Sequence, residues 1–192
     1  VTTTADTTNA TVDTQSPSGL VDADISIIGA SGTAGAYKVG DTVTVVVDPA
    51  NIANLDGGSL TADFTAFGGG AAVAASLVND GNDANDGKYV ATYQLVEGAI
   101  DGTNLNVSMS VTDDAGNTLV VADTTNATVD TQSPSLADAD ISISGYSGTA
   151  DAYKVGDTVT VVIDPATNAD LSTVTADFTA FGGGAAVAAS LV

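Results

Sequence analysis

Short runs rich in valine and threonine, separated by clusters of glycine, aspartate and asparagine, recur along the whole chain. Five runs have the length of a β-strand, and several alternate hydrophobic and polar positions with a period of two. These five runs cover residues 41–48, 60–67, 88–95, 104–112 and 119–129. Two shorter candidates cover residues 24–28 and 71–77. No stretch repeats its hydrophobic positions at helical spacing, so the pattern predicts an all-β chain.

The segments between the runs have turn composition. They include DPAN at 48–51, NDGNDANDG at 79–87 and DDAGN at 113–117. About seven short strands in ~110 residues, separated by such turns, are typical of an immunoglobulin-like sandwich of two antiparallel sheets. The predicted fold class is therefore all-β, with immunoglobulin-like antiparallel β-sandwich modules.

The sequence also repeats itself over a long period. Identical or nearly identical pairs are residues 5–18 with 122–135, 61–78 with 175–192, and 20–50 with 136–166, the last pair matching at 26 of 31 positions. The period is about 115 residues, which exceeds the 20 to 50 residues of solenoid and propeller repeats. Each copy is therefore expected to be a tandem domain with its own core.

The alignment divides the chain into three parts. We expect residues 1–18 to be the C-terminal strand and linker of an upstream repeat, 19–130 a complete repeat, and 131–192 the N-terminal half of the next repeat. Half of a sandwich does not close a core. Either the polypeptide continues beyond both ends, or a neighbouring molecule completes the half-module.

Acidic residues dominate the charge of the chain. There are 24 acidic and 3 basic residues, for a formal net charge of −21, and Glu97 is the one acid that is not aspartate. A generally acidic surface would be expected to contain glutamate as well, whereas the short aspartate suits turns, caps and metal coordination. The composition therefore points to local chemistry of aspartate.

The same composition excludes several partners and activities. The scarcity of basic residues argues against nucleic acid and against an anionic membrane surface, and no run of 18 apolar residues predicts membrane insertion. Histidine, cysteine and arginine are absent, which removes the usual bases, nucleophiles and anion clamps. We therefore predict that the chain is not an enzyme and has no catalytic residues.

Four segments together resemble a known family. They are GAYKVGDTVTVVVD at 35–48, DGKYVATYQL at 86–95, DGTNLNVSMSVTDDAGNT at 101–118 and NATVDTQSP at 126–134. They are similar to the bacterial immunoglobulin-like repeats of giant surface adhesins, in which a segment like VTDDAGN and a VDTxxP linker recur. This chain departs from that pattern at Gln15 and Ser16, where Thr-Ala is frequent, and in the triple glycine at 68–70.

The resemblance implies an extracellular, cell-surface protein whose repeats are rigid, calcium-dependent extenders holding a distal binding domain away from the cell. The partners would then be neighbouring repeats of the same chain. A subunit of an extracellular filament or S-layer, assembled from identical chains by lateral or strand-exchange contacts, is the alternative.

The residues themselves also favour calcium, which takes six to eight hard oxygen ligands. Asp22 and Asp24 lie two apart at the expected start of a strand, so both side chains are predicted to point the same way, within reach of one ion. A single ion between modules would use groups from the DDAGN turn, the linker and the next module. The candidate ligands, with their repeat copies, are Asp13, Asp22, Asp24, Asp113, Asp114, Asn117, Asp130, Asp138 and Asp140. The simpler reading of any one of these aspartates is an Asx turn or a solvated loop residue.

Overall fold

The computed structural model describes residues 2–82, 84–98, 100–164 and 171–190. It divides into two compact units, Val1–Gln132 and Ser133–Val192. The described residues are all-β, with short 3₁₀ turns as their helical segments. The prediction of an all-β chain of antiparallel sheets is confirmed, and the arrangement of the first unit is consistent with a β-sandwich.

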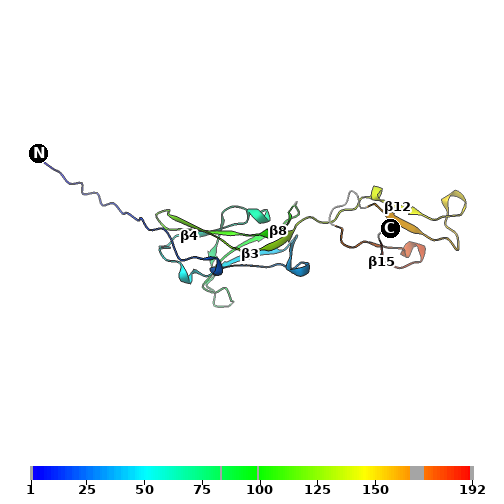
Figure 1. Ribbon diagram of the computed structural model, residues 1–192, viewed down its shortest axis with the longest axis horizontal. Coiled ribbons are helices and arrows are strands. Elements are labelled where there is room, and N and C mark those ends of the chain that lie inside the picture. The colour runs from blue at the N-terminus through cyan, green and yellow to red at the C-terminus, as the bar shows by residue number, and fades with distance from the viewer. Residues whose placement is uncertain (1, 83, 99, 165–170, 191–192) are drawn as a thin grey trace. The chain divides into compact units, whose positions relative to one another are not determined.

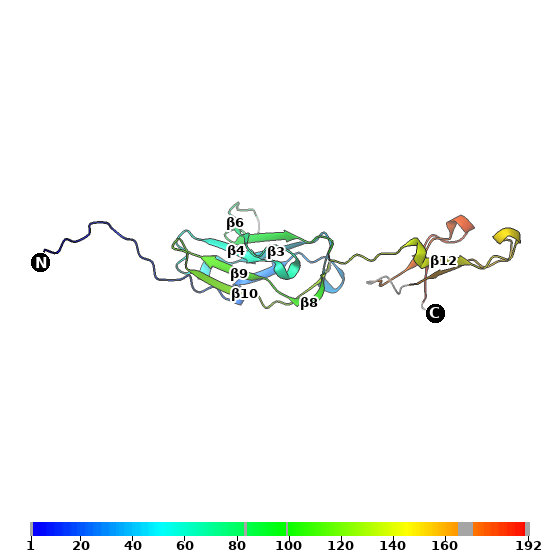
Figure 2. The same ribbon diagram turned by 90° about the horizontal axis from the view of Figure 1, so that it is seen from above.

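Two four-stranded antiparallel sheets form the body of the first unit (Figure 1). The first has the order β1 (Ile25–Ile28), β3 (Thr42–Val47), β7 (Tyr89–Gln94) and β6 (Ser76–Leu77). The second has the order β10 (Thr118–Ala122), β9 (Ser108–Thr112), β4 (Ser59–Asp63) and β5 (Val73–Ala74). Figure 2 shows this unit from above, with β3, β4, β9 and β10 among its labelled strands.

A smaller three-stranded sheet closes one side of this unit. Its order is β2 (Tyr37–Lys38), β11 (Ala127–Asp130) and β8 (Asp101–Leu105). β11 runs parallel to β2, with Val129 opposite Tyr37, and antiparallel to β8. The chain therefore returns to pair with its own beginning just before it leaves the unit.

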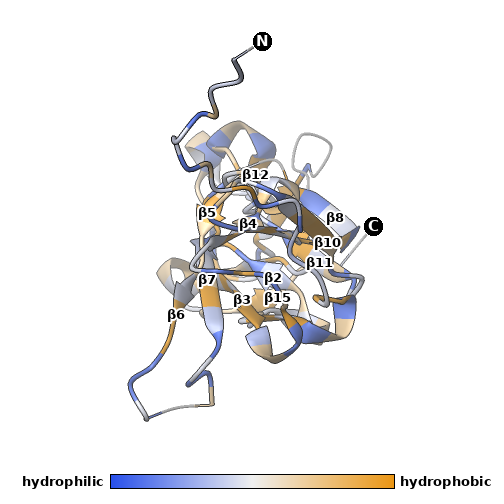
Figure 3. Cartoon of the chain, turned by 90° about the vertical axis from the view of Figure 1, so that its left-hand side faces the viewer, coloured by the Kyte–Doolittle hydropathy of each residue, from blue (hydrophilic) through white to orange (hydrophobic). Residues whose placement is uncertain are grey.

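Both large sheets contribute to one hydrophobic core. Val43, Val45 and Val47 of β3 are fully buried, and they pack in the same cluster as Leu60 of β4 and Met109 of β9. Each such side chain contributes roughly 1.5–3 kcal/mol of burial energy. Hydrophobic positions, orange in Figure 3, recur along β3 and β7 in this interior.

The second unit repeats the first half of this structure. Its hairpins are β12 (Ile141–Ser144) with β13 (Thr160–Ile163), and β14 (Thr175–Ala176) with β15 (Val187–Ala188). Ile141 is 39% exposed where its copy Ile25 is 4% exposed, and Phe181 is 49% exposed where its copy Phe67 is 1% exposed. The copies of Ile25 and Phe67 therefore lack the burial that the first unit gives them within its hydrophobic core.

Several strand boundaries differ from the prediction. The run at 60–67 ends as a strand at Asp63 and continues into a 3₁₀ turn, η4 (Thr65–Phe67). The runs at 104–112 and 119–129 are each divided between two strands. The DG pair at 101–102, which has turn composition, opens β8. β2 has only two residues and is not signalled by any hydrophobic run.

Candidate functional site

The β9–β10 hairpin turn carries three of the predicted calcium ligands. The Asp113 carboxylate accepts hydrogen bonds from the backbone N–H of Asn117 at 2.8 Å and from its side-chain amide at 2.9 Å. Burial alone would raise the pKa of Asp113, but the hydrogen bonds from Asn117, Ala115 and Gly116 hold it below its usual range. Asp113 therefore remains ionised and organises the turn.

This turn lies at the end of the first unit where the chain enters. The Asn117 amide also donates to the Gln15 carbonyl at 3.5 Å. Asp114 lies against Gly57, where an added Cβ would come within 3.3 Å of the Asp114 Oδ2 atom. The DDAGN turn is thus adjacent to the segment that precedes the unit.

Asp130 lies at the opposite end of the same unit. It pairs with Lys38 and Asp101 across the small sheet, and its carboxylate accepts from the Gln132 N–H at 3.0 Å. β10 and β11 run between the Asp113 turn and Asp130. The structure therefore does not bring these two residues together, and a single ion bound by both is not supported within this unit.

Asp13 is the sequence copy of Asp130 and forms the same Asx turn. Its carboxylate accepts from the Gln15 N–H at 2.9 Å. Gln15 is the residue whose carbonyl meets the Asn117 amide. Of the two linker aspartates, Asp13 is consequently the one close to the Asp113 turn.

Asp22 and Asp24 do not have the predicted geometry. They lie in a 3₁₀ turn, η1 (Asp22–Asp24), and not at the start of an extended strand, and their carboxylates have different hydrogen-bond partners. Asp24 accepts from the Val21 N–H and from the Asn51 side chain, both at 3.0 Å. Asp22 accepts from the backbone N–H and the hydroxyl of Thr124, at 2.7 and 2.8 Å.

The copies in the second unit behave alike. Asp138 and Asp140 lie in a 3₁₀ turn, η5 (Asp138–Asp140), and Asp140 accepts from the Ala137 N–H at 2.8 Å. The extended backbone that the prediction assumed for each DxD pair is not found in either unit. A 3₁₀ turn does not have the period of two that the prediction assumed.

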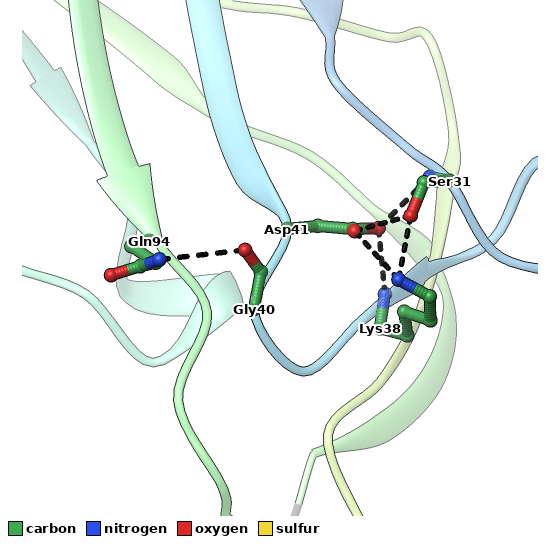
Figure 4. Close-up of polar contacts among 5 residues, drawn as sticks. All are labelled: Ser31, Lys38, Gly40, Asp41 and Gln94. Atoms are coloured by element: carbon green, nitrogen blue, oxygen red, sulfur yellow. Dashed lines mark hydrogen bonds and ion pairs between the residues drawn. The ribbon is translucent and has the colours of Figure 1, made fainter.

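The strongest polar cluster of the first unit was missed by sequence reasoning (Figure 4). The buried Asp41 carboxylate accepts from the Ser31 N–H at 2.9 Å, the Ser31 hydroxyl at 2.5 Å and the Lys38 N–H at 3.1 Å. It also forms an ion pair with the Lys38 ammonium at 3.1 Å. Burial acts to raise the pKa of Asp41, but these hydrogen bonds lower it far below its usual range.

The repeat could have revealed this cluster. Ser147, Lys154 and Asp157 are the copies of its members, and Asp157 accepts from the Ser147 N–H, the Ser147 hydroxyl and the Lys154 N–H at 2.9, 2.5 and 3.0 Å. The cluster fastens the loop after the first strand to the turn that opens the next strand. It is a structural device, present in both units.

A second missed residue is Asp123, which follows β10. It is 1% exposed, and its Oδ1 atom accepts from the Thr125 N–H at 3.2 Å. Its Oδ2 atom is buried and has no hydrogen-bond partner among the described residues. The neighbouring Tyr37 has its pKa raised to about 12 by burial and by the charges of Asp41 and Asp123.

Other features of the described residues offer little chemistry. A surface groove of about 330 Å³ is lined by Ile27, Tyr37, Thr125 and Ala127 among others, and its lining holds no carboxylate, imidazole or thiol. Within the described ranges, no group of three or more acidic residues is arranged to hold a metal ion. Among these residues no helix is both long and apolar enough to cross a membrane.

Comparison of the chain with family models, with curated proteins and with solved structures found no match in any of the three.

Proposed function

We propose that this chain is part of an array of immunoglobulin-like spacer modules in a secreted cell-surface adhesin, stiffened by calcium and holding a distal binding domain away from the cell. The observation that carries the proposal is how the chain enters and leaves the first unit. It enters at the end where β3 finishes and β4 begins, and it leaves at the end where β3 starts.

Both connections are anchored to the module. At the upstream end, Pro17 is buried, and Ser18 exchanges backbone hydrogen bonds with Ala53 at 3.1 and 2.9 Å. At the downstream end, Thr131 is 1% exposed and its N–H donates to the Ile100 carbonyl at 2.7 Å. A module held at opposite ends adds its own length to an array.

Because the sequence repeats, the linker between neighbouring modules is the short segment between these two anchors. Residues 5–18 and 122–135 are identical, so each joint of the array contains both the downstream anchor at Thr131 and the upstream anchor seen at Pro17. The copy of Pro17 is Pro134, which is exposed beside the half-module. Where a complete module follows and buries this proline as Pro17 is buried, only Gln132 and Ser133 would lie between the anchors. So short a linker restricts the relative motion of neighbouring modules far more than a flexible linker would.

Calcium would act at the upstream end of each module. The Asn117 amide of the Asp113 turn donates to the Gln15 carbonyl, and Asp13 lies two residues before Gln15, so the incoming linker carries a carboxylate next to the segment that contacts this turn. A divalent cation would cancel their repulsion and supply a rigid joint. The joint site would then draw on Asp13 and on Asp113 or Asp114, brought together by the ion, because these three are not already clustered in the described residues.

Small-angle scattering of a recombinant array of four copies of residues 16–132 tests the proposal. The expected result is a length that grows in proportion to the number of modules, with shortening when a chelator removes calcium. Asp113→Asn should reproduce the shortening, and Asp80→Asn, in a distant loop, serves as the matched control. A length unchanged by chelation would remove calcium from the mechanism, and a size independent of module number would refute the spacer.

A filament subunit is the second candidate, and one observation favours it. Residues 10–13 carry the sequence of β11 but are exposed: Val12 is 78% exposed, whereas its copy Val129 is fully buried. The second unit has an unpaired copy of β2, at Tyr153 and Lys154, that could accept such a strand from another molecule. Concentration-dependent oligomers in light scattering, lost on Val12→Asp, would support strand exchange over the monomeric spacer.

A further inference from the structure

Asp123 is a buried carboxylate whose hydrogen bonding is incomplete. Its backbone N–H donates to the Val107 carbonyl at 3.0 Å, and its Oδ1 atom accepts from Thr125. Its Oδ2 atom is shielded from solvent and has no donor among the described residues. An anionic oxygen in this state is unfavourable unless a cation or a proton accompanies it.

A second carboxylate faces it. Asp22 is held by the amide and hydroxyl of Thr124, the residue next to Asp123, at 2.7 and 2.8 Å. The Asp22 carboxylate is therefore held beside the segment that carries Asp123.

Among the described residues, no basic group forms an ion pair with Asp22 or Asp123. The ion pair formed within the described residues joins Lys38 to Asp41, and it does not involve Asp22 or Asp123. With a formal net charge of −21, the chain as a whole attracts cations to such a position.

We propose that Asp22 and Asp123 bind one hard divalent cation within the complete module. The ion would coordinate the Asp123 Oδ2 atom and the Asp22 carboxylate, and water and backbone carbonyls would complete a shell of oxygen ligands. It would tie η1, which precedes the first strand, to the segment that follows β10. The site lies inside one module, so its test is independent of the spacer role and of the calcium site proposed at the joint.

The chain contains matched controls. Asp6 is the sequence copy of Asp123, within 14 identical residues, and its carboxylate accepts from the Thr8 N–H at 2.9 Å in the same local turn. Asp6 is exposed and has no counterpart of Asp22 beside it. Asp6→Asn thus removes the same charge from the same sequence without touching the site.

The experiment uses the full 192-residue chain and calcium alone as the probe. Isothermal titration and thermal unfolding, in calcium and in chelator, are compared for the wild type, Asp123→Asn, Asp22→Asn and Asp6→Asn. In Asp123→Asn the new amide donates to Asp22, so this variant is expected to fold in chelator at least as well as the wild type. Calcium affinity at one site should fall by roughly tenfold or more in Asp123→Asn and Asp22→Asn, because ligand charge sets affinity. Asp6→Asn should keep both the affinity and the calcium-dependent rise in melting temperature.

Terbium provides a second readout. The chain has no tryptophan, so its emission is sensitised by tyrosine, and Tyr37 lies within electrostatic range of Asp123. Sensitised emission should be lost in Asp123→Asn and retained in Asp6→Asn. The proposal is overturned if Asp123→Asn binds calcium as tightly as the wild-type chain does. It is also overturned if calcium leaves the stability of the wild-type chain unchanged and equal to that of Asp123→Asn, because the two carboxyls would then share a proton.

Discussion

Replacing Asp41 with alanine removes the acceptor at the centre of the Ser31–Lys38 cluster. The Asp41 side chain is 6% exposed, and it accepts from two backbone N–H groups that belong to different turns. An alanine methyl group offers neither of them a partner. The loop after β1 and the turn before β3 would lose their common attachment.

The magnitude follows from the groups left unpaired. Each partly buried N–H without an acceptor costs roughly 1–3 kcal/mol. The Lys38 side chain is 55% exposed, so its ion pair adds at most about 1 kcal/mol. Because water can reach part of the opened cluster, we expect Asp41→Ala to lower the free energy of unfolding by about 3 kcal/mol.

Equilibrium denaturation of the full chain, followed by circular dichroism, measures this loss. Asp157→Ala is the matched control, because Asp157 accepts the same backbone hydrogen bonds in the exposed copy of the cluster. Its effect on the main unfolding transition should be clearly smaller. If Asp41→Ala costs less than ~1 kcal/mol, the typical net value of one hydrogen bond, the reasoning from unpaired donors is refuted. Equal effects of the two variants would refute the role assigned to burial.

Three further outcomes are expected. In denaturant titration, Phe67→Ala should lower the free energy of unfolding by about 3–5 kcal/mol. Phe181→Ala, which changes the exposed copy of Phe67, should lower it by less than ~1 kcal/mol. Similar losses in the two variants would show that the second unit buries the same core. Thr131→Val removes the hydroxyl that bonds both the N–H and the carbonyl of Ile100 at 3.1 Å, and should cost about 2 kcal/mol while increasing linker proteolysis. Because the pKa of Asp41 is lower in the folded chain, the unfolded state takes up its proton first on acidification. Melting temperature should therefore fall as pH drops below the ordinary value of 3.8, and a rise over that interval would contradict the assignment.

The body of the fold is predictable because valine and threonine runs and their flanking turns report directly on buried strands. Residues 41–48 and 88–95 contain β3 and β7, the two central strands of one sheet. β2 could not be found in this way. Its two residues are extended because β11 pairs with them, and that pairing is a long-range contact.

The candidate sites were less predictable for related reasons. The expected behaviour of Asp22 and Asp24 depended on an extended backbone, whereas the Asp24 N–H donates to the Val21 carbonyl and closes a 3₁₀ turn there. The position of Asp113 relative to Asp130 depends on which end of the sandwich each turn occupies, which spacing alone does not determine. Asp123 and its exposed copy Asp6 have the same local sequence. Only tertiary packing distinguishes them.

The distance between the two anchored ends of the first unit tests the spacer account most directly. The chain has no cysteine, so Ser16→Cys and Gln132→Cys allow spin labels to be placed where the linker meets each end. Pulsed electron–electron double resonance on this doubly labelled chain should give one narrow distribution of distances between the two labels. The mean distance should be well above the ~20 Å length of a six-residue strand such as β3. A distance below ~20 Å, or a broad distribution extending to short distances, would show that the chain does not enter and leave at opposite, anchored ends, and would contradict the account.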